Sequence, residues 1–268
     1  MTRVIIVTDL DGTLLDPVTY WFSGAEDAVE WLMGEGVPIV FNSSKSRAEQ
    51  EVYRRALGLH DPFIVENGAA IYYEDPVEGA ERVGPYWAEV FGLRAESIRA
   101  LIEDLIRKYE GAIRLIDEMS DEEISRVTGL PPSLAGLARV REYSVVYAPV
   151  DREGAAEMAE EIVRRGLRYT FGGRLYVVTG PHHKGTALKA LRAKYPGARI
   201  VALGDGTNDV EMLREADIPI LLGGKEEVAR AVGRSDLITY PGRGPEWWAR
   251  AVEEVLSPIL RSGEHQPR

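Results

Sequence analysis

The stretch Val4-Ile5-Ile6-Val7-Thr8-Asp9-Leu10-Asp11-Gly12-Thr13-Leu14 decides the fold of this chain. Its first part, Val4–Thr8, is the continuous apolar run that is typical of parallel strands covered by helices on both faces. Asp9 and Asp11 follow directly, at the carboxyl end of the strand, which is where open α/β sheets bind their ligands. The stretch therefore predicts a buried parallel strand that carries two carboxylates to a binding edge.

The alternation of strand and helix continues on both sides of a long middle segment. Ser23 with Glu26, and Ser46 with Glu49, have the spacing of capping boxes and predict the starts of two helices. Strands that alternate with helices in this way favour a parallel sheet between two helical layers. We therefore predict an α/β fold with a three-layer, parallel-sheet core. The further strands predicted for this core are Val37–Phe41, Phe63–Val65, Ala69–Tyr73, Arg199–Leu203, Ile218–Leu222 and Leu237–Tyr240.

The middle of the chain has longer helices and fewer strands than its two ends. Gly172-Gly173 is a hairpin signal between the predicted strands Leu167–Phe171 and Arg174–Thr179. We therefore expect residues 83–180 to form an α/β lobe inserted into a core made of residues 1–82 and 181–268. The other elements predicted in the lobe are helices at Ala95–Tyr109, Ser120–Val127 and Arg152–Arg165 and strands at Tyr86–Phe91 and Tyr143–Ala148.

Composition excludes several classes of function. The 268 residues include 32 Lys and Arg against 43 Asp and Glu, and the resulting net charge of -11 disfavours DNA and RNA as partners. Without cysteine there is no disulfide, no thiolate metal site and no cysteine nucleophile. No run approaches the roughly 18 apolar residues of a membrane span, and the N-terminal apolar run reaches Asp9 too early for a signal peptide. We expect a cytoplasmic protein with a small-molecule substrate and no membrane partner.

The pair Asp9 and Asp11 suits phosphoryl transfer. Residues two apart in an extended chain project to the same side, and Gly12 lets the chain turn away from them. Two carboxylates at one point repel each other unless a cation lies between them or one keeps a proton. One carboxylate can attack phosphorus while the other protonates the leaving oxygen. A solvated pair of aspartates in a turn is the alternative.

Three more motifs stand at ends of predicted elements. Phe41-Asn42-Ser43-Ser44-Lys45 ends the second strand, and Lys184 begins a helix. Gly204-Asp205-Gly206-Thr207-Asn208-Asp209 follows a strand. Phosphoryl transfer needs positive charge and hydrogen-bond donors around the phosphoryl oxygens, so a lysine, a Mg²⁺ ion held by carboxylates and a hydroxyl-bearing loop are the expected parts. Taken singly, each motif is also compatible with a helix cap, a solvated lysine or an ordinary turn.

In order and content, the four motifs together resemble those of the haloacid dehalogenase-like phosphatases. The resemblance implies a Rossmann-like core, an aspartyl-phosphate intermediate and Mg²⁺ as cofactor. It implies that Asp9 is the nucleophile, Asp11 the acid and base, and Lys184 the cation that balances the charge of the nucleophile and of the phosphoryl group. The implied metal ligands are Asp9, Asp11, Asp205 and Asp209, and Asn208 supports the site.

The inserted lobe resembles the large α/β cap of the Cof-type (type IIB) members, as does Glu66-Asn67-Gly68-Ala69. Within that group, four segments are similar to the mannosyl-3-phosphoglycerate phosphatases: Ser43-Ser44-Lys45-Ser46, Arg141-Glu142-Tyr143, Gly172-Gly173-Arg174-Leu175-Tyr176 and Gly244-Pro245-Glu246-Trp247-Trp248. That resemblance implies a small phosphorylated sugar-acid substrate and a role in making mannosylglycerate, a compatible solute. The residues then expected to bind substrate are Ser43, Ser44, Lys45, Arg47, Asn67, Arg141, Arg174 and Asn208.

Other functions remain open at this point. A glucosyl analogue, sucrose phosphate, phosphoglycolate or a range of sugar phosphates could be the substrate. A phosphomannomutase would share the motifs and return the phosphoryl group to a sugar hydroxyl. A binding module on an inactive scaffold would require the loss of Asp9 or Asp205, and both are present.

Overall fold

The computed structural model describes residues 4–261, which fall into two compact units. The first unit comprises residues 1–40 and 192–268, and the second comprises residues 41–191. In the described residues, no helix is both long enough and apolar enough to span a bilayer.

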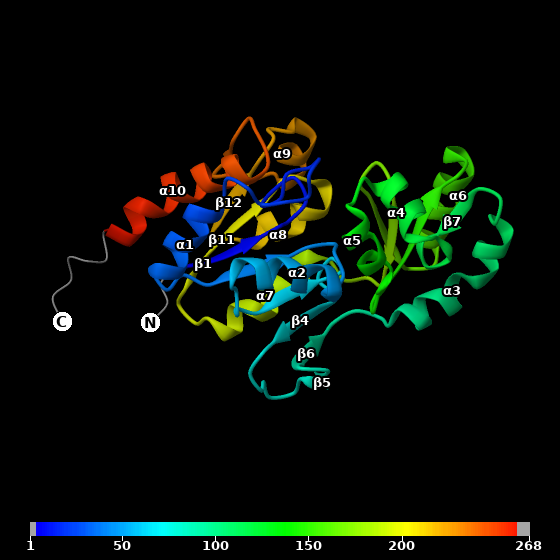
Figure 1. Ribbon diagram of the computed structural model, residues 1–268, viewed down its shortest axis with the longest axis horizontal. Helices are drawn as coiled ribbons and strands as arrows, with labels where there is room; N and C mark the ends of the chain where they lie inside the picture. The colour runs from blue at the N-terminus through cyan, green and yellow to red at the C-terminus, as the bar shows by residue number, and fades with distance from the viewer. Residues whose placement is uncertain (1–3, 262–268) are drawn as a thin grey trace. The chain divides into compact units, whose positions relative to one another are not determined.

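The first unit holds a parallel sheet in the order β13-β12-β11-β1. In Figure 1 the blue strand β1 lies beside the yellow strand β11, although most of the chain separates them in sequence. Ile6 of β1 also donates a backbone hydrogen bond to Pro38, so the chain entering the next strand runs along the other side of β1. The strands of this unit are β1 (Val4–Thr8), β11 (Arg199–Gly204), β12 (Ile218–Leu221) and β13 (Ile238–Thr239). Its helices are α1 (Glu26–Gly34), η3 (Thr207–Asp209), α8 (Val210–Glu215), α9 (Glu226–Val232) and α10 (Pro245–Arg261).

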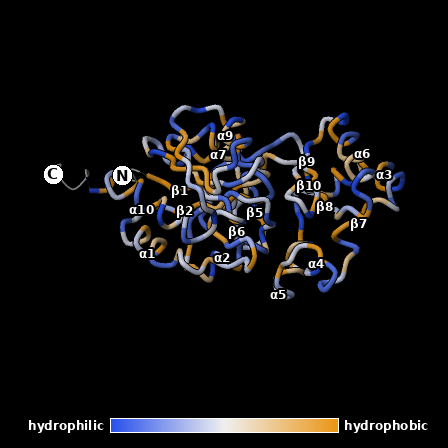
Figure 2. Tube along the Cα trace, turned by 90° about the horizontal axis from the view of Figure 1, so that it is seen from above, coloured by the Kyte–Doolittle hydropathy of each residue, from blue (hydrophilic) through white to orange (hydrophobic). Residues whose placement is uncertain are grey.

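The central strand of this unit is buried on both faces, whereas its helices are buried on one. Every residue of β1 is buried, as its apolar run predicted, whereas helices such as α1 bury one face only. Figure 2 shows this contrast as orange at β1 and a mixture of orange and blue around α1. Trp248 of α10 is fully buried, and its indole nitrogen donates to the Thr8 hydroxyl at 2.9 Å. This bond fixes the last helix against the strand end that carries Asp9.

The second unit contains a mixed sheet in the order β2-β3-β4-β6-β5. Strand β2 (Ile39–Asn42), which spans the division between the units, pairs with β3 in parallel, and the remaining pairs are antiparallel. The other elements around this sheet are α2 (Arg47–Leu57), β3 (Phe63–Val65), β4 (Ala70–Tyr73), β5 (Glu81–Val83), β6 (Tyr86–Val90) and α7 (Lys184–Lys194).

A separate antiparallel sheet in the same unit has the order β7-β8-β10-β9. Helices α3 (Ala95–Lys108) and α6 (Arg152–Arg164) share an apolar core with it, in which Ile102 and Met158 belong to the same cluster as Val145 and Val178. Its strands are β7 (Ile113–Leu115), β8 (Ser144–Pro149), β9 (Arg168–Phe171) and β10 (Tyr176–Thr179). The remaining short elements are η1 (Ile116–Glu118), α4 (Asp121–Thr128), α5 (Pro132–Ala135) and η2 (Gly136–Arg139).

The structure confirms the α/β class with a parallel-sheet core and corrects one helix start. Ser46 and Glu49 form the predicted capping box at the start of α2. The box predicted for Ser23 and Glu26 is absent, because α1 begins at Glu26 with Ala25 at its N-cap and no side-chain cap. The Glu26 carboxylate instead accepts a hydrogen bond from the backbone of Gly24 at 2.6 Å.

Candidate active site

Two parallel strands bring Asp9 and Asp205 to the same edge of the first unit. Thr8 at the end of β1 stands in register with Leu203 of β11, and the Asp9 backbone donates to the Leu203 carbonyl at 2.9 Å. Asp205 follows β11 directly. Because neighbouring parallel strands end at one edge, the first and fourth motifs meet there as the sequence predicted.

Asp209 completes a group of three carboxylates with Asp9 and Asp205. The Asp209 carboxylate accepts hydrogen bonds from the backbones of Asp205 and Gly206, each at 2.9 Å, and this fixes the turn after β11. A Cβ atom at Gly204 would lie 2.5 Å from the Asp209 side chain, so only glycine allows this approach. The motif spacing is therefore explained by a turn that folds the third aspartate back onto the second.

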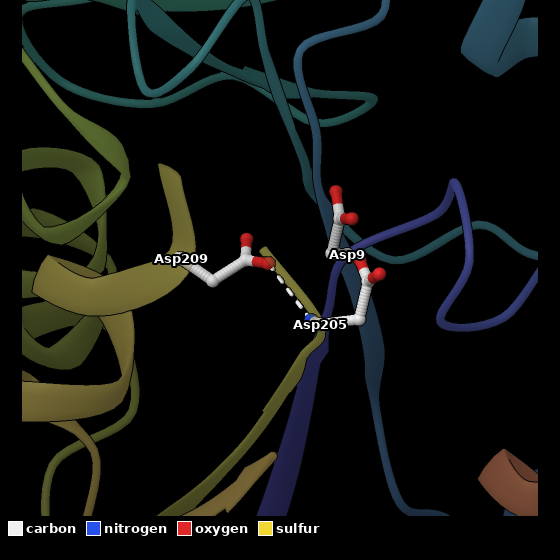
Figure 3. A group of neighbouring side chains, drawn as sticks. All are labelled: Asp9, Asp205 and Asp209. Carbon is white, nitrogen blue, oxygen red and sulfur yellow. Dashed lines mark hydrogen bonds between the residues drawn. The ribbon is translucent and has the colours of Figure 1, made fainter. Parts of the chain in front are cut away.

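One oxygen from each of these three aspartates lies within 4.8 Å of the others, and all three residues are buried (Figure 3). We call Asp9, Asp205 and Asp209 the three-aspartate group. Three carboxylates this close repel one another when ionised, so either a nearby cation balances their charge or one of them keeps a proton. The donors are all oxygens, which suits a hard divalent ion. The group can therefore hold a divalent metal ion.

Two cations at this edge were missed by the sequence analysis. Lys225 donates to the Asp205 carboxylate at 3.1 Å, and Arg243 lies 3.9 Å from the same oxygen. Each of them follows a parallel strand, β12 for Lys225 and β13 for Arg243. Their position after strand ends, within Gly-Gly-Lys and Gly-Arg-Gly sequences, was the signal that could have identified them.

Asp11 and Asn208 lie on the turns that surround the three-aspartate group. The turn after β1 is closed by backbone bonds from Thr13 and Leu15 to Leu10, and Asp11 is half-buried on it. Gly12 has a φ of +77°, and a Cβ there would come within 2.9 Å of the Asp205 carboxylate. The Asp11 carboxylate is not a member of the group, and Asn208 lies in η3. Their roles in the reaction stay predictions.

The second unit brings together the second and third motifs. Asn42 donates from its side chain to the Lys184 carbonyl at 3.1 Å. The backbone of Asn67 donates to the Ser43 carbonyl at 2.9 Å, and the Lys45 backbone donates to the Ser43 hydroxyl at 3.2 Å. Lys184 is fully buried at the start of α7. Ser43 is therefore joined to Asn67 by a backbone hydrogen bond, and Asn42, the residue before Ser43, joins the start of α7 at the Lys184 carbonyl.

Lys45 and Arg141, both expected to bind substrate, form ion pairs with the same buried glutamate. Glu49 contacts the Lys45 ammonium at 3.6 Å and the Arg141 guanidinium at 3.2 Å. Burial raises the pKa of Glu49, but the two cations and the Ser46 hydrogen bonds outweigh it and hold the pKa below its ordinary value. Arg141 also donates to the Ser44 carbonyl at 2.8 Å, which ties it to the second motif. Substrate contact by these cations and by Ser44 stays a prediction.

The other two predicted cations also have protein partners. Arg47 forms ion pairs with Glu51 at 2.6 Å and with Glu142 at 2.8 Å. Burial lowers the pKa of Arg47, and the hydrogen bonds to these two carboxylates more than offset it, so the pKa lies above its ordinary value. Arg174 is exposed and donates to the Thr128 carbonyl at the end of α4. Their contact with substrate is likewise untested.

Known proteins resemble the chain over nearly its whole length. It is 36% identical over 265 residues to the glucosyl-3-phosphoglycerate/mannosyl-3-phosphoglycerate phosphatase of Methanococcoides burtonii, covering 94% of this chain and 97% of that protein. It is 41% identical over 231 residues to the mannosyl-3-phosphoglycerate phosphatase of Pyrococcus furiosus, covering 83% of this chain and 92% of that protein.

Solved structures share the fold at low sequence identity. A haloacid dehalogenase-like hydrolase from Bacteroides thetaiotaomicron matches with a TM-score of 0.71 at 16% identity, covering 95% of this chain and all of that one (100%). A HAD subclass IIB sugar phosphatase matches with a TM-score of 0.65 at 17% identity, covering 96% of this chain and 100% of that one. The model of one family, described as haloacid dehalogenase-like hydrolase, matches residues 6–81 and 149–233. With the motifs placed at strand ends as described, the chain belongs to the haloacid dehalogenase-like hydrolases.

Proposed function

We propose that the protein hydrolyses phosphomonoesters with Asp9 as its nucleophile. The observation that carries the proposal is the three-aspartate group at the ends of β1 and β11, where Asp9 is buried beside two further carboxylates. A buried carboxylate held by backbone geometry at a strand end is positioned to attack, and the neighbouring aspartates supply oxygen ligands for a metal. This combination favours phosphoryl transfer over a binding role without catalysis.

The reaction proceeds in two steps that balance in atoms and charge. A carboxylate oxygen of Asp9 bonds to phosphorus while the ester bond breaks, and Asp11 gives its proton to the leaving oxygen. In the second step a water molecule attacks the same phosphorus, and Asp11 takes the proton of that water. Inorganic phosphate leaves, and Asp9 returns as the free carboxylate.

The remaining residues of the motifs balance charge and hold the phosphoryl oxygens. Lys184 supplies a positive charge against the nucleophile and the phosphoryl group, and the Ser43 hydroxyl donates to a phosphoryl oxygen. Asp9, Asp205, Asp209 and the backbone of Asp11 would hold Mg²⁺, which when bound supplies positive charge to the phosphoryl oxygens. Asn208 supports the turn that carries these ligands.

We propose mannosyl-3-phosphoglycerate as the substrate. The relatives described above are named for this compound, and the name of one also includes the glucosyl epimer, which makes that epimer the second candidate. Either substrate carries a carboxylate besides its phosphate, and guanidinium groups suit forked recognition of a carboxylate. Arg174 is the cation proposed for that contact, and Asn67 and the other predicted cations are proposed to line the same subsite.

We propose a division into a core of residues 1–82 and 181–268 and a substrate-selecting lobe of residues 83–180, with one correction. The strand predicted in the lobe at Tyr86–Phe91 is β6, which pairs with β4 in the larger sheet and does not belong to the lobe's own sheet. In support of the division, the sheet β7-β8-β10-β9 has its own apolar core with α3 and α6. That core is built from residues 98–178, all of which fall inside the proposed lobe. Variation of such a lobe can change the substrate without touching the nucleophile.

A panel of substrates tests the proposal. Phosphate release is measured with mannosyl-3-phosphoglycerate, its glucosyl epimer, phosphoglycolate, sucrose 6-phosphate, mannose 6-phosphate and p-nitrophenyl phosphate. We expect the highest kcat/KM for the two glycosyl-3-phosphoglycerates. Interconversion of mannose 6-phosphate and mannose 1-phosphate without net phosphate release would instead establish a mutase, and activity highest on phosphoglycolate would overturn the substrate.

A further inference from the structure

The turn between β3 and β4 has an unusual backbone. Glu66, Asn67 and Gly68 have successive φ angles of 47°, 61° and 91°, all in the left-handed region. Glutamate rarely adopts this conformation, which costs roughly 1 kcal/mol or more per residue other than glycine. Such conformations persist where the surrounding contacts fix them, and they concentrate at functional sites.

The Glu66 carboxylate accepts three hydrogen bonds from one short segment of chain. Its Oε1 accepts from the backbone of Glu142 at 2.8 Å, and its Oε2 accepts from the backbone of Tyr143 at 3.1 Å. The hydroxyl of Ser144, the first residue of β8, also donates to Oε2. The side chain is completely buried, so these donors replace its whole hydration shell.

The backbone of Glu66 contacts the segments that carry the second and third motifs. Its amide donates to the Lys45 carbonyl at 3.1 Å, directly after Ser43 and Ser44. Its carbonyl accepts from Nε2 of His182 at 3.2 Å, two residues before Lys184. One residue therefore has direct bonds to the loop after β2, to the segment before α7 and to the segment before β8.

Asn67 and Gly68, the rest of the turn, also contact the Ser43 loop and the start of α7. Asn67 donates to the Ser43 carbonyl at 2.9 Å. A Cβ on Gly68 would lie 2.3 Å from the His183 carbonyl oxygen and 3.0 Å from the Cα of Lys184. The turn therefore contacts both the Ser43 loop and the start of α7. At Gly68 the backbone itself makes the contact, because there is no space for a side chain.

We propose that Glu66 is a positioning residue that holds the Ser43 loop and the Lys184 helix start in one fixed relation by fastening the turn to residues 142–144. The inference rests on the proposed function only in naming what is positioned, the donors and the cation that meet the phosphoryl group. Glu66 touches no reacting atom and acts through the turn.

The charge of Glu66 matters in this arrangement, because all three of its partners are donors. Burial raises the pKa of Glu66 above its ordinary value, and Arg141, Ser144 and the two backbone amides offset this only in part. Glutamine has the same shape but would turn an amide NH₂ group toward at least one N–H or O–H donor. Glu66→Gln should therefore loosen the fastening without creating a cavity.

Hydrogen exchange and kinetics of Glu66→Gln test the proposal together. Glu89→Gln is the matched control, because Glu89 of β6 is a partly buried carboxylate that accepts from the hydroxyl of Tyr73, the last residue of β4, at 3.2 Å, whereas the turn precedes the first residue of that strand. In Glu66→Gln we expect faster hydrogen exchange at the backbone amides of Glu142 and Tyr143. We expect the backbone amides of residues 66 and 67 to exchange faster as well. We expect kcat on p-nitrophenyl phosphate to fall about tenfold or more with KM changed less than about threefold, because misplaced groups weaken the transition state. Glu89→Gln should change neither measurement.

Ser144→Ala extends the test through the same contact. It removes one donor to Glu66, and its effect on kcat should be less than additive with that of Glu66→Gln. If Glu66→Gln does not fold, Ser144→Ala alone must still speed exchange at Asn67. Unchanged exchange at Asn67, or a kcat within twofold of wild type in the folded variant, overturns the inference. If the wild type releases no phosphate from any ester, the proposed function fails, and the exchange measurement still decides the positioning.

Discussion

Glu49 is a buried carboxylate whose charge is balanced by two cations from different parts of the chain. The sequence shows four basic residues near motifs, and all four were expected to meet an anionic substrate. In the structure Glu49 forms ion pairs with two of them: Lys45, just before the start of its own helix, and Arg141, 92 positions away in the sequence. A one-dimensional pattern shows the charge but not the distant partner that neutralises it. The aspartates were predictable because their spacing is local.

Asp9→Asn tests the nucleophile. The amide has nearly the same shape but cannot form the acyl phosphate, so we expect kcat to fall by about a thousandfold or more while the protein stays folded. Phosphate release and the thermal unfolding midpoint are measured on the same preparation, with the exposed Asp236→Asn as control. Retention of a tenth of the wild-type rate in folded Asp9→Asn would exclude this nucleophile.

His182 makes stability depend on pH. Burial lowers the pKa of His182 to about 4, although the Glu66 carbonyl that it contacts raises it. Between pH 4 and 6.5 the unfolded chain therefore binds a proton that the folded protein does not, so this residue destabilises the protein as the pH falls through that window. The loss is on the order of 3 kcal/mol. Urea unfolding at pH 7 and pH 4.5 should show a smaller difference for His182→Gln, which keeps one donor, than for wild type. Equal differences would contradict the neutral, buried histidine.

Arg174→Ala tests recognition of the carboxylate. Loss of one charge-assisted contact, about 1.5–3 kcal/mol, predicts a ten- to hundredfold lower kcat/KM for mannosyl-3-phosphoglycerate. p-Nitrophenyl phosphate has no carboxylate and should lose little. Arg165→Ala is the control, since Arg165 pairs with the exposed Asp104 at 2.6 Å. Equal losses on both substrates would mean that the bond from Arg174 to Thr128 is its whole contribution.

At the scale of elements, prediction succeeded where the signal lies within the element's own residues. The all-buried β1 and the Ser46 capping box were both confirmed. Two short strands were missed: β5 is mostly exposed, and β7 has only Ile113 and Leu115 as buried positions. Such strands form because a partner strand is present, β6 for one and β8 for the other, so their own residues carry little signal.

Gly68→Ala tests the turn between β3 and β4. Alanine would have to accept a φ of 91° and a Cβ placed 2.3 Å from the His183 carbonyl. Gly84→Ala is the matched control, because Gly84 has a φ of 60° but no atom within 4 Å of its Cβ position. Backbone strain alone predicts a loss of about 1 kcal/mol for the control. We expect Gly68→Ala to lose at least about twice that in urea unfolding and to lower kcat as well. The same loss in both variants would mean that the turn can move away from Lys184.

For the whole molecule, the order of the chain explains why the site was visible in the sequence. β1 and β11 come from opposite ends of the chain and pair in parallel, so motifs far apart in sequence reach one edge by a rule of sheet topology. Lys225 and Arg243 follow the same rule, but each is a single cation after a short strand, β12 or β13, and so forms no extended motif in the sequence. Glu66 obeys no such rule, since its role depends on a contact with residues 142–144 that no local pattern shows.

The excess of 43 acidic over 32 basic residues makes the stability of the whole protein sensitive to bound cations. A net charge of -11 with three buried aspartates means that a bound divalent ion relieves repulsion in the folded state only. A ligand at a hundred times its Kd stabilises by about 2.7 kcal/mol, which for a protein of this size raises Tm by several degrees. We expect Mg²⁺ to raise Tm, EDTA to remove both this shift and the activity, and added Mg²⁺ to restore both. Asp205→Asn should lose most of the shift, whereas Glu226→Gln, a change at an exposed carboxylate, should keep it. An equal shift in Asp205→Asn would place the ion elsewhere, and activity restored by Zn²⁺ alone would contradict Mg²⁺, because a site made only of oxygen ligands favours the harder ion.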